Sequence, residues 1–197
     1  MFNKLFFIAV ALLLFTSCKK TRGCTDSEAL NYNPDAAKDD RSCYYYWIGQ
    51  NYGGGKVFYI DVTKKHGLIA ADFDIGGLGY PWGGANENTV GADGTTVGTG
   101  YQNTVDIVNA YGEGTAAYAC FNLDTLGYDD WYLPSKEELR GVGKAFIDLG
   151  QGNFTGSYYS SSTEIDASNI WTMYSTNYSL ENKSKGTIGS TRPIRSF

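Results

Sequence analysis

The chain is poor in the groups on which catalytic metal sites and membrane-spanning helices depend. It has one histidine in 197 residues, and no apolar run in it reaches the roughly 20 residues that cross a bilayer. One histidine cannot build a His-based zinc cluster, and no second one is present to activate a serine or cysteine nucleophile. That residue, His66, follows two lysines and precedes a glycine, which is typical of a turn. We therefore expect a protein that is not an enzyme.

The first seventeen residues predict a secretory signal peptide. Lys4 precedes an apolar run of 11 residues from Leu5 to Phe15, which is too short to span a membrane as a helix. The run ends in Phe-Thr-Ser-Cys, which resembles a bacterial lipobox, in which the cysteine is diacylated and becomes the mature N-terminus. We therefore expect a lipid on Cys18 and a location in the bacterial cell envelope, at the outer membrane. The alternative is an ordinary signal peptide cut nearby, which would leave Cys18 as a plain thiol.

The charge balance is acidic. The chain has 16 basic and 21 acidic residues. Removal of the signal takes away Lys4, so that 15 basic residues remain against 21 acidic ones, a net charge of −6. This balance disfavours nucleic acid, and other polyanions held by bulk charge, as partners.

Cysteines divide the chain into a tether, a small module and a larger domain. Residues 18–22 form the tether, residues 23–43 are bracketed by Cys24 and Cys43, and residues 44–197 remain. In an oxidising compartment Cys24 and Cys43 are expected to form a disulfide. Cys120 is left over among alanines, where we expect a buried thiol.

The module is rich in acidic side chains and asparagines, which could hold a structural Ca²⁺. It lacks the order of an EF-hand loop, and the alternative is a solvated acidic spacer. No other cofactor is expected. The calcium-ligand candidates are Asp26, Asp35, Asp39 and Asp40.

The strongest structural pattern is a short buried strand that turns into a helix. Trp131 to Leu133 form an aromatic and aliphatic run that Pro134 ends. Ser135 and Glu138 then have the spacing of a capping box. Four apolar residues follow on one helical face before the stop at Gly150, namely Leu139, Val142, Phe146 and Leu149.

The other elements predict an α+β domain. Lys56 to Val62 and Gly67 to Ala71 predict a hairpin, and Asp72 to Gly100 a long irregular loop that contains Trp82. One helix is expected from Asn103 or Thr104 to Tyr111, with Val105, Val108 and Tyr111 inward, and a short one over residues 116–121. Closing strands are predicted over Tyr158–Thr163, Ile170–Ser175, Tyr178–Lys183 and Thr191–Phe197.

A set of short motifs runs through residues 44–197, namely Gly54–Tyr59, His66–Leu68, Trp82–Gly83, Gly98–Gly100, Asp130–Leu139, Ser162–Glu164 and Arg192–Phe197. In these motifs the chain resembles the C-terminal domain family of a Legionella collagen-like protein. The resemblance implies a variant of the C-type lectin-like fold, and the namesake's implied activity is adhesion to host glycosaminoglycan or matrix. Members often have cysteine at the position of Gly84 and tryptophan at that of Ser160, and the signatures of calcium-dependent sugar binding are absent.

The resemblance and the aromatic content favour an adhesin-like recognition domain for a glycan or an extracellular protein. Its ring candidates can stack on a ligand or simply fill the core. Arg192 and Arg195, with Glu164, can form a ligand clamp or structural ion pairs. The ring candidates are Trp82, Tyr158, Tyr159, Trp171 and Tyr174.

Two alternatives stay open at this stage. One is a structural or assembly lipoprotein of the envelope that binds no small ligand. The other is a relative of the formylglycine-generating enzymes, which share the implied fold. That chemistry needs two reactive cysteines, and only Cys120 lies within the domain.

The lipid anchor can be tested directly. Replacement of Cys18 by alanine removes the thiol that would be acylated, so Cys18→Ala should abolish fatty-acid labelling and release the protein from the membrane fraction. Labelling that persists in the variant would show that the lipid is attached elsewhere.

Overall fold

The computed structural model describes residues 20–89 and 91–197, with no side-chain description for Leu78. The predicted signal peptide and Cys18 lie outside these residues. Contacts divide the chain into one unit that ends at Tyr44 and a second unit, Tyr45–Phe197. Across the described ranges, no helix combines the length and the apolar character that crossing a membrane requires.

The small unit is closed by the predicted disulfide. Cys24 and Cys43 are bonded, with their Cα atoms 4.8 Å apart, which confirms the expected pair. Two short strands, β1 (Arg22–Gly23) and β2 (Lys38–Asp39), pair in parallel beside it. Cys24 and Ala29 are buried. A unit with so small a core depends on its covalent cross-link for stability.

The large unit begins with a four-stranded sheet in the order β11-β5-β4-β3. The predicted hairpin is present as β4 (Gly55–Ile60) and β5 (Gly67–Ala71), which pair antiparallel. Strand β3 (Asn51–Tyr52) flanks β4, and β11 (Ile194–Ser196) flanks β5. Residues 131–133 form no strand of their own, although Tyr132 bridges to β11.

A five-stranded sheet follows, in the order β6-β10-β7-β8-β9. The expected closing strands are present as β7 (Tyr158–Glu164), β8 (Asn169–Tyr174) and β9 (Leu180–Ser184). The last predicted strand is in fact two, because the chain leaves this sheet after β10 (Gly189–Thr191) and enters the other as β11. Strand β6 (Ile75–Tyr80) lies where the sequence predicted only loop.

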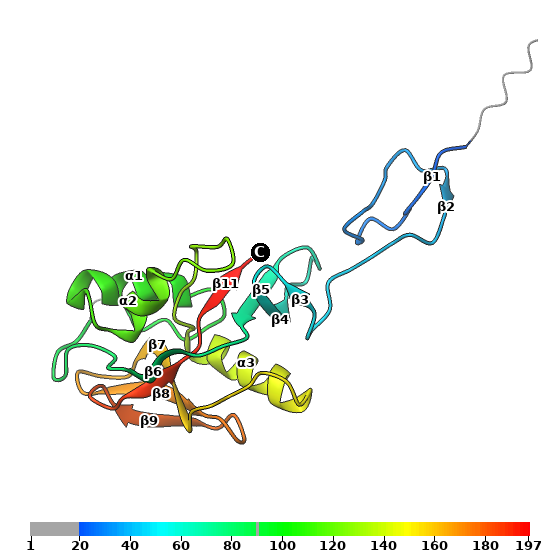
Figure 1. Cartoon of the computed structure of the whole chain (residues 1–197). Helices are drawn as coiled ribbons and strands as arrows, with labels where there is room; N and C mark the ends of the chain where they lie inside the picture. Colours follow the sequence, from blue (N-terminus) through cyan, green and yellow to red (C-terminus); the bar gives the residue numbers. More distant parts are fainter. Residues whose placement is uncertain (1–19, 90) are drawn as a thin grey trace, which may run out of the picture. The chain divides into compact units, whose positions relative to one another are not determined.

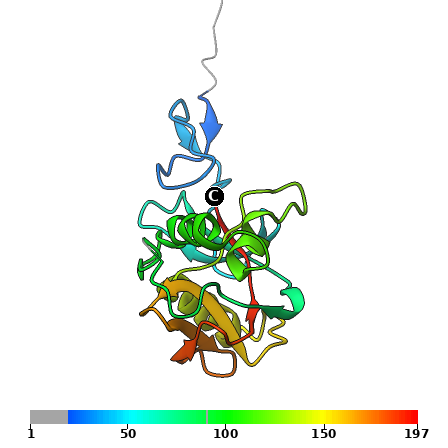
Figure 2. The same cartoon turned by 90° about the vertical axis from the view of Figure 1, so that its left-hand side faces the viewer.

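Three helices complete the α+β unit: α1 (Gly100–Tyr111), α2 (Ala116–Phe121) and α3 (Lys136–Asp148). The predicted start of α1 was wrong, because Thr99 is its N-cap and Asn103 is buried inside it. The Asn103 side chain bonds to Gly94 and so holds the preceding loop. The inward residues of α1 include Thr104 and Ile107 rather than Val105. Helices α1 and α2 lie side by side in both ribbon views (Figures 1 and 2).

Helix α3 packs against both sheets, through β4 on one and β7 and β8 on the other (Figure 1). Val142 and Phe146 join the cluster of Phe58 from β4, whereas Leu139 packs with Tyr159 and Met173 of the five-stranded sheet. The predicted apolar stripe is therefore correct over three residues. Leu149, its fourth member, is 47% exposed, because the helix ends at Asp148.

The capping box at the start of α3 is confirmed, and it holds more than the helix. The Ser135 N–H donates to Glu138 Oε2 at 2.8 Å, and the Glu138 N–H donates to Ser135 Oγ. The second carboxylate oxygen of Glu138 accepts the N–H of Gly98 at 2.8 Å, and Ser135 Oγ donates to the Thr96 carbonyl. Burial raises the pKa of Glu138, although the N–H donors partly lower it. The loop before α1 is therefore fixed to the first turn of α3.

Glu138→Gln should destabilise the large unit by about 1–3 kcal/mol, because an amide nitrogen would face buried N–H donors that the carboxylate now accepts. Urea unfolding measures this difference. The matched control is Glu137→Gln, one residue away, where the carboxylate makes only partly exposed ion pairs with Lys136 and Arg140. The control should change stability by less than about 1 kcal/mol. Equal losses in the two variants would contradict the role assigned to Glu138.

Candidate ligand-binding surface

The structure separates the predicted ring candidates, and Trp82 proves to be a core residue. Its side chain is completely buried, in a cluster with Ile107 of α1 and Ala117 of α2. The indole Nε1 donates to the carbonyl of Ser161 at 2.8 Å. A ring with no exposed surface cannot stack on a ligand, so the prediction of Trp82 as an anchor is corrected.

Trp82 lies beside a buried ion pair that holds the long loop in place. Lys185 Nζ is 3.4 Å from Glu164 Oε1, and both side chains are almost entirely buried. The ammonium lies 4.8 Å from the centroid of the Trp82 ring and donates to the carbonyl of Glu87. The other Glu164 oxygen accepts the N–H of Thr89 at 2.7 Å. Glu164 therefore makes a structural ion pair and is not part of a ligand clamp.

Arg192 belongs to a second buried ion pair, which also binds the hydroxyl of Tyr159. Its guanidinium is 2.6 Å from Asp74 and donates to the carbonyls of Ala71 and Gly152. The buried Tyr159 hydroxyl donates to Asp74 at 2.6 Å, and burial raises the pKa of that hydroxyl. Neither Arg192 nor Tyr159 is available to a ligand, which corrects both predictions.

Arg195 lies in β11, whereas Arg192 lies in the break between β10 and β11. Arg195 pairs with Asp130 at 2.6 Å, and its guanidinium stacks 3.9 Å from the centroid of the Tyr128 ring. It also donates to the Gly53 carbonyl. The two arginines therefore do not form one clamp. Arg195 makes a structural ion pair and joins β11 to the segments that contain Gly53 and Asp130.

Trp171 and Tyr174 come from the same strand but point to opposite faces, because successive side chains alternate along β8. Trp171 is on the side of Met173, which packs against α3. Its ring lies 4.1 Å beneath the ammonium of Lys136. Trp171 is therefore half-buried under the first turn of α3, away from Tyr174.

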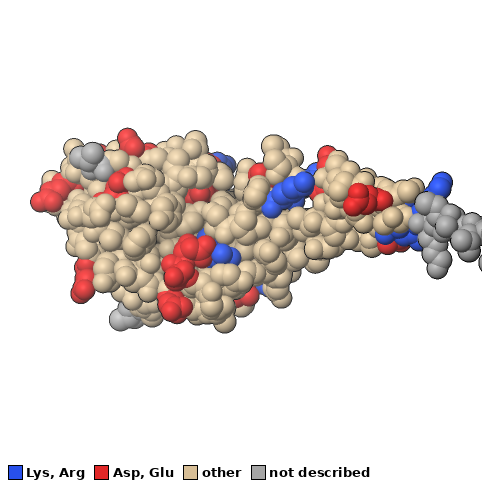
Figure 3. All heavy atoms as spheres, turned by 90° about the horizontal axis from the view of Figure 1, so that it is seen from above, with Lys and Arg blue, Asp and Glu red and all other residues tan. Residues whose placement is uncertain are grey.

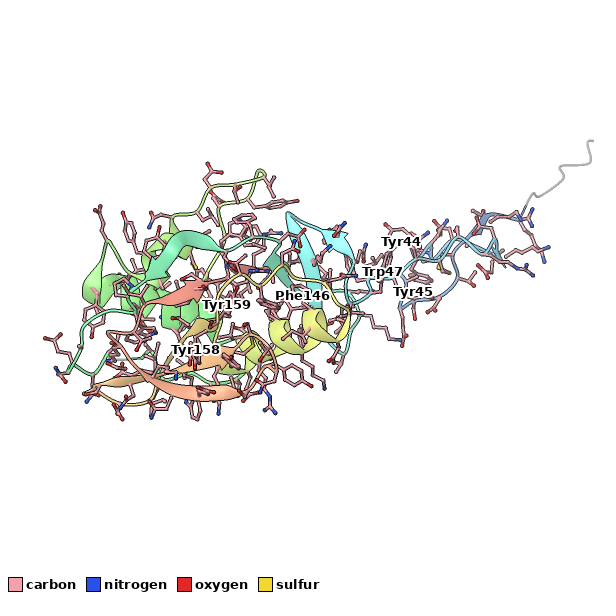
Figure 4. All side chains as sticks on the ribbon, turned by 60° about the horizontal axis from the view of Figure 1, so that its bottom comes forward. Tyr44, Tyr45, Trp47, Phe146, Tyr158 and Tyr159 are labelled. Carbon is pink, nitrogen blue, oxygen red and sulfur yellow. A yellow bond between two sulfur atoms is a disulfide. The ribbon has the colours of Figure 1, made fainter. Side chains whose placement is uncertain are left out.

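Tyr158 and Tyr174 do come together, on the side of the five-stranded sheet opposite Trp171 and Met173. They are paired across β7 and β8, their ring centroids are 5.1 Å apart, and both rings are half-buried. Lys183 of β9 lies over the Tyr158 ring at 4.1 Å and pairs with Glu181 at 3.2 Å, and the bond to Glu181 raises the pKa of that lysine. Figure 4 labels Tyr158 and its buried neighbour Tyr159 on β7.

We call Tyr158, Tyr174, Glu181 and Lys183 the tyrosine face. Sequence reasoning found its two tyrosines and missed its two charged residues. The missing signal was the register of β8 and β9, in which Thr172 pairs with Glu181 and Ile170 with Lys183. Only that pairing shows that the charged side chains share a face with Tyr174.

The remaining candidates form no reactive or metal-binding centre among the residues described. No group of three or more His, Cys, Asp or Glu side chains there could hold a metal ion. Asp26, Asp39 and Asp40 accept N–H groups of their own turns, and Asp35 lies in a turn bonded by Asn33. These bonds hold the acidic side chains against their own turns, and both the calcium site and the solvated spacer stay predictions for this loop. His66 is exposed in the β4–β5 turn.

Cys120 is the one free cysteine in the described residues, and it is buried in α2. Burial raises the pKa of its thiol far above the ordinary value, which disfavours the thiolate that a reactive cysteine needs. At the position where relatives of the resembled family often have cysteine, a Cβ on Gly84 would meet the Tyr111 ring at 2.3 Å.

No family model matches the chain, and no curated protein shows significant similarity to it.

Because Trp82 is buried against α1 and α2, Trp82→Ala should destabilise the large unit by about 3–5 kcal/mol. Guanidinium unfolding gives the difference. Trp47→Ala is the control, since that tryptophan is 60% exposed, and its removal should change stability by no more than about 0.5 kcal/mol. A Trp82→Ala variant as stable as the control would contradict the core role.

Proposed function

We propose that the chain is a lipid-anchored cell-envelope protein whose large unit is a non-catalytic recognition domain of the C-type lectin-like class. Its ligand is a glycan or an extracellular protein, bound at the tyrosine face. The observation that carries the proposal is the pair formed by Tyr158 and Tyr174, whose half-buried rings lie on one face of the five-stranded sheet with centroids 5.1 Å apart.

The tyrosine face has the features of a preformed recognition surface. Its two rings are held by neighbouring strands, so that little side-chain freedom remains to be lost on binding. Tyrosine offers a ring for stacking and a hydroxyl for hydrogen bonds, which suits sugars and peptide side chains alike. Lys183 and Glu181 add a donor and an acceptor at the edge of the rings.

The charge distribution supports contacts that are aromatic and hydrogen-bonding rather than ionic. The face shown in Figure 3 carries acidic side chains in small separate groups and few basic ones. The net charge of the chain is −5. An extended polyanion would have no broad basic surface to follow on the face seen in that figure, so binding by bulk charge is disfavoured.

The proposal that the domain is non-catalytic is supported by the surroundings of its cysteine and its histidine. The thiol of Cys120 is buried, and His66 stands alone in an exposed turn. A formylglycine-generating activity would need a second reactive cysteine beside Cys120, and Cys24 and Cys43 are joined to each other.

The test is a screen of the mature chain against glycans and matrix proteins at low and high salt, followed by affinity measurements on the best ligand. Tyr158→Ala and Tyr174→Ala should each weaken binding by about 1–3 kcal/mol. Tyr59→Ala is the control, because Tyr59 is 38% exposed on β4 of the other sheet. Affinity should change little with salt, whereas a polyanion held by Lys and Arg would dissociate steeply as salt rises.

Three outcomes would contradict the proposal. Equal effects of the Tyr59 and Tyr158 variants would move the site away from the tyrosine face. Tight heparin binding that disappears at high salt would replace the aromatic mode by an ionic one. Absence of any ligand in the screen would favour the structural lipoprotein.

A further inference from the structure

An apolar rim lies at the C-terminal end of α3, outside the tyrosine face of β7, β8 and β9. We use the name apolar rim for Trp47, Ile48 and Leu149, which are 60%, 40% and 47% exposed. Residues 47–50 form a turn in which the Gln50 N–H donates to the Trp47 carbonyl. This turn lies against the helix end, because a Cβ on Gly49 would be 2.9 Å from Leu149 Cδ1. Figure 4 labels Trp47.

A shallow groove of about 370 Å³ runs from this rim along α3. Phe58, which is 5% exposed, lies at its floor beside Gly141, where an added Cβ would stand 3.4 Å from the ring. Lys144 and Asp148 contribute one charge of each sign, so the groove has little net charge. Its lining residues are Ile48, Phe58, Gly141, Lys144, Ala145, Asp148 and Leu149.

The covalent path between Cys18 and the rim is short because the disulfide bypasses the small module. Six residues lead from Cys18 to Cys24 and four from Cys43 to Trp47, at about 3.5 Å each, and the disulfide adds 4.8 Å between Cα atoms. Trp47 therefore stays within about 40 Å of Cys18, whereas the uncross-linked chain could extend to about 100 Å. A tether of the shorter length gives the apolar rim an effective concentration on the order of millimolar at the membrane surface that would hold the anchor.

We infer that the apolar rim docks on the surface of the bilayer that carries the Cys18 lipid. This inference rests on the anchor proposed above. Tryptophan favours the membrane–water interface, and Ile48 and Leu149 supply the aliphatic contact. Lys144 can extend its ammonium to a lipid phosphate while its methylene groups cover the groove. Because Asp148 balances Lys144, the apolar contact carries the docking and anionic lipid adds little.

The test attaches the mature chain to vesicles chemically, so that it does not require the native lipid. A maleimide lipid is coupled at Cys18, since Cys24 and Cys43 are joined and Cys120 is buried. The vesicles contain phosphatidylethanolamine and phosphatidylglycerol, with or without phosphatidylcholine brominated on its acyl chains. Bromine quenches tryptophan only at close range. Trp82 and Trp131 are fully buried and Trp171 lies under Lys136, so Trp47 is the reporter.

Docking predicts bromine-dependent quenching that disappears in Trp47→Phe. Leu149→Ser should reduce the docked fraction about fivefold, because it removes part of the free energy that burial of a leucine side chain contributes. Leu126→Ser is the matched control, since Leu126 is 67% exposed outside the rim, and it should leave quenching unchanged. Cleavage of the disulfide lengthens the tether and should also lower the docked fraction.

Four results would overturn the inference. They are quenching that is absent, quenching that survives Trp47→Phe, equal loss in the Leu126 and Leu149 variants, and Leu149-dependent dimers of the chain in the absence of vesicles. The last would assign the rim to a second copy. Fatty-acid labelling of Cys18 and ligand binding at the tyrosine face are measured separately, so failure of the anchor or of ligand recognition is distinguishable from failure of docking.

Discussion

The buried carboxylate of Glu138 is the interaction on which the arrangement of the large unit depends. It accepts the N–H of Ser135 at the start of α3 and the N–H of Gly98 at the same time. Helix α3 supplies the apolar contacts that join the two sheets, and α1 begins two residues after Gly98. One side chain thus sets the position of both helices, and no apolar contact could do so because N–H groups without acceptors are costly to bury.

The same solution recurs wherever a long irregular segment must be held. Lys185 and Glu164 hold the main chain at Glu87 and Thr89, and Arg192 with Asp74 holds residues 71–74 and 152–153. Residues 87–89 (Glu-Asn-Thr) and 152–153 (Gly-Asn) have no large apolar side chain to bury. Hydrogen bonds from buried charges to main-chain carbonyl and N–H groups replace the missing packing. Such pairs favour one conformation, whereas their net contribution to stability is small.

Much of the fold could be predicted from the sequence where local pattern and tertiary packing agree. The capping box at Ser135, the β4–β5 hairpin and the Cys24–Cys43 bond all have short-range signals. Strand β6 was missed because the Ile-Gly-Gly-Leu-Gly-Tyr sequence has no alternation, and its pairing with β10 comes from over 100 residues away. Only the two tyrosines of the tyrosine face could be predicted, and its two charged residues were missed for a similar reason. Exposure of each ring follows from strand register, which single-sequence patterns do not contain.

The break between β10 and β11 determines when this unit can fold. Strand β10 is the only link between β6 and β7 in the five-stranded sheet, and β11 carries the bridge between Tyr132 and the four-stranded sheet. Both strands lie between residues 189 and 196, so neither sheet is complete until that segment is available. A chain delivered from its N-terminus, as in synthesis or export, could therefore complete neither sheet until residues 189–196 had emerged. Over that interval its exposed strands would need protection from aggregation.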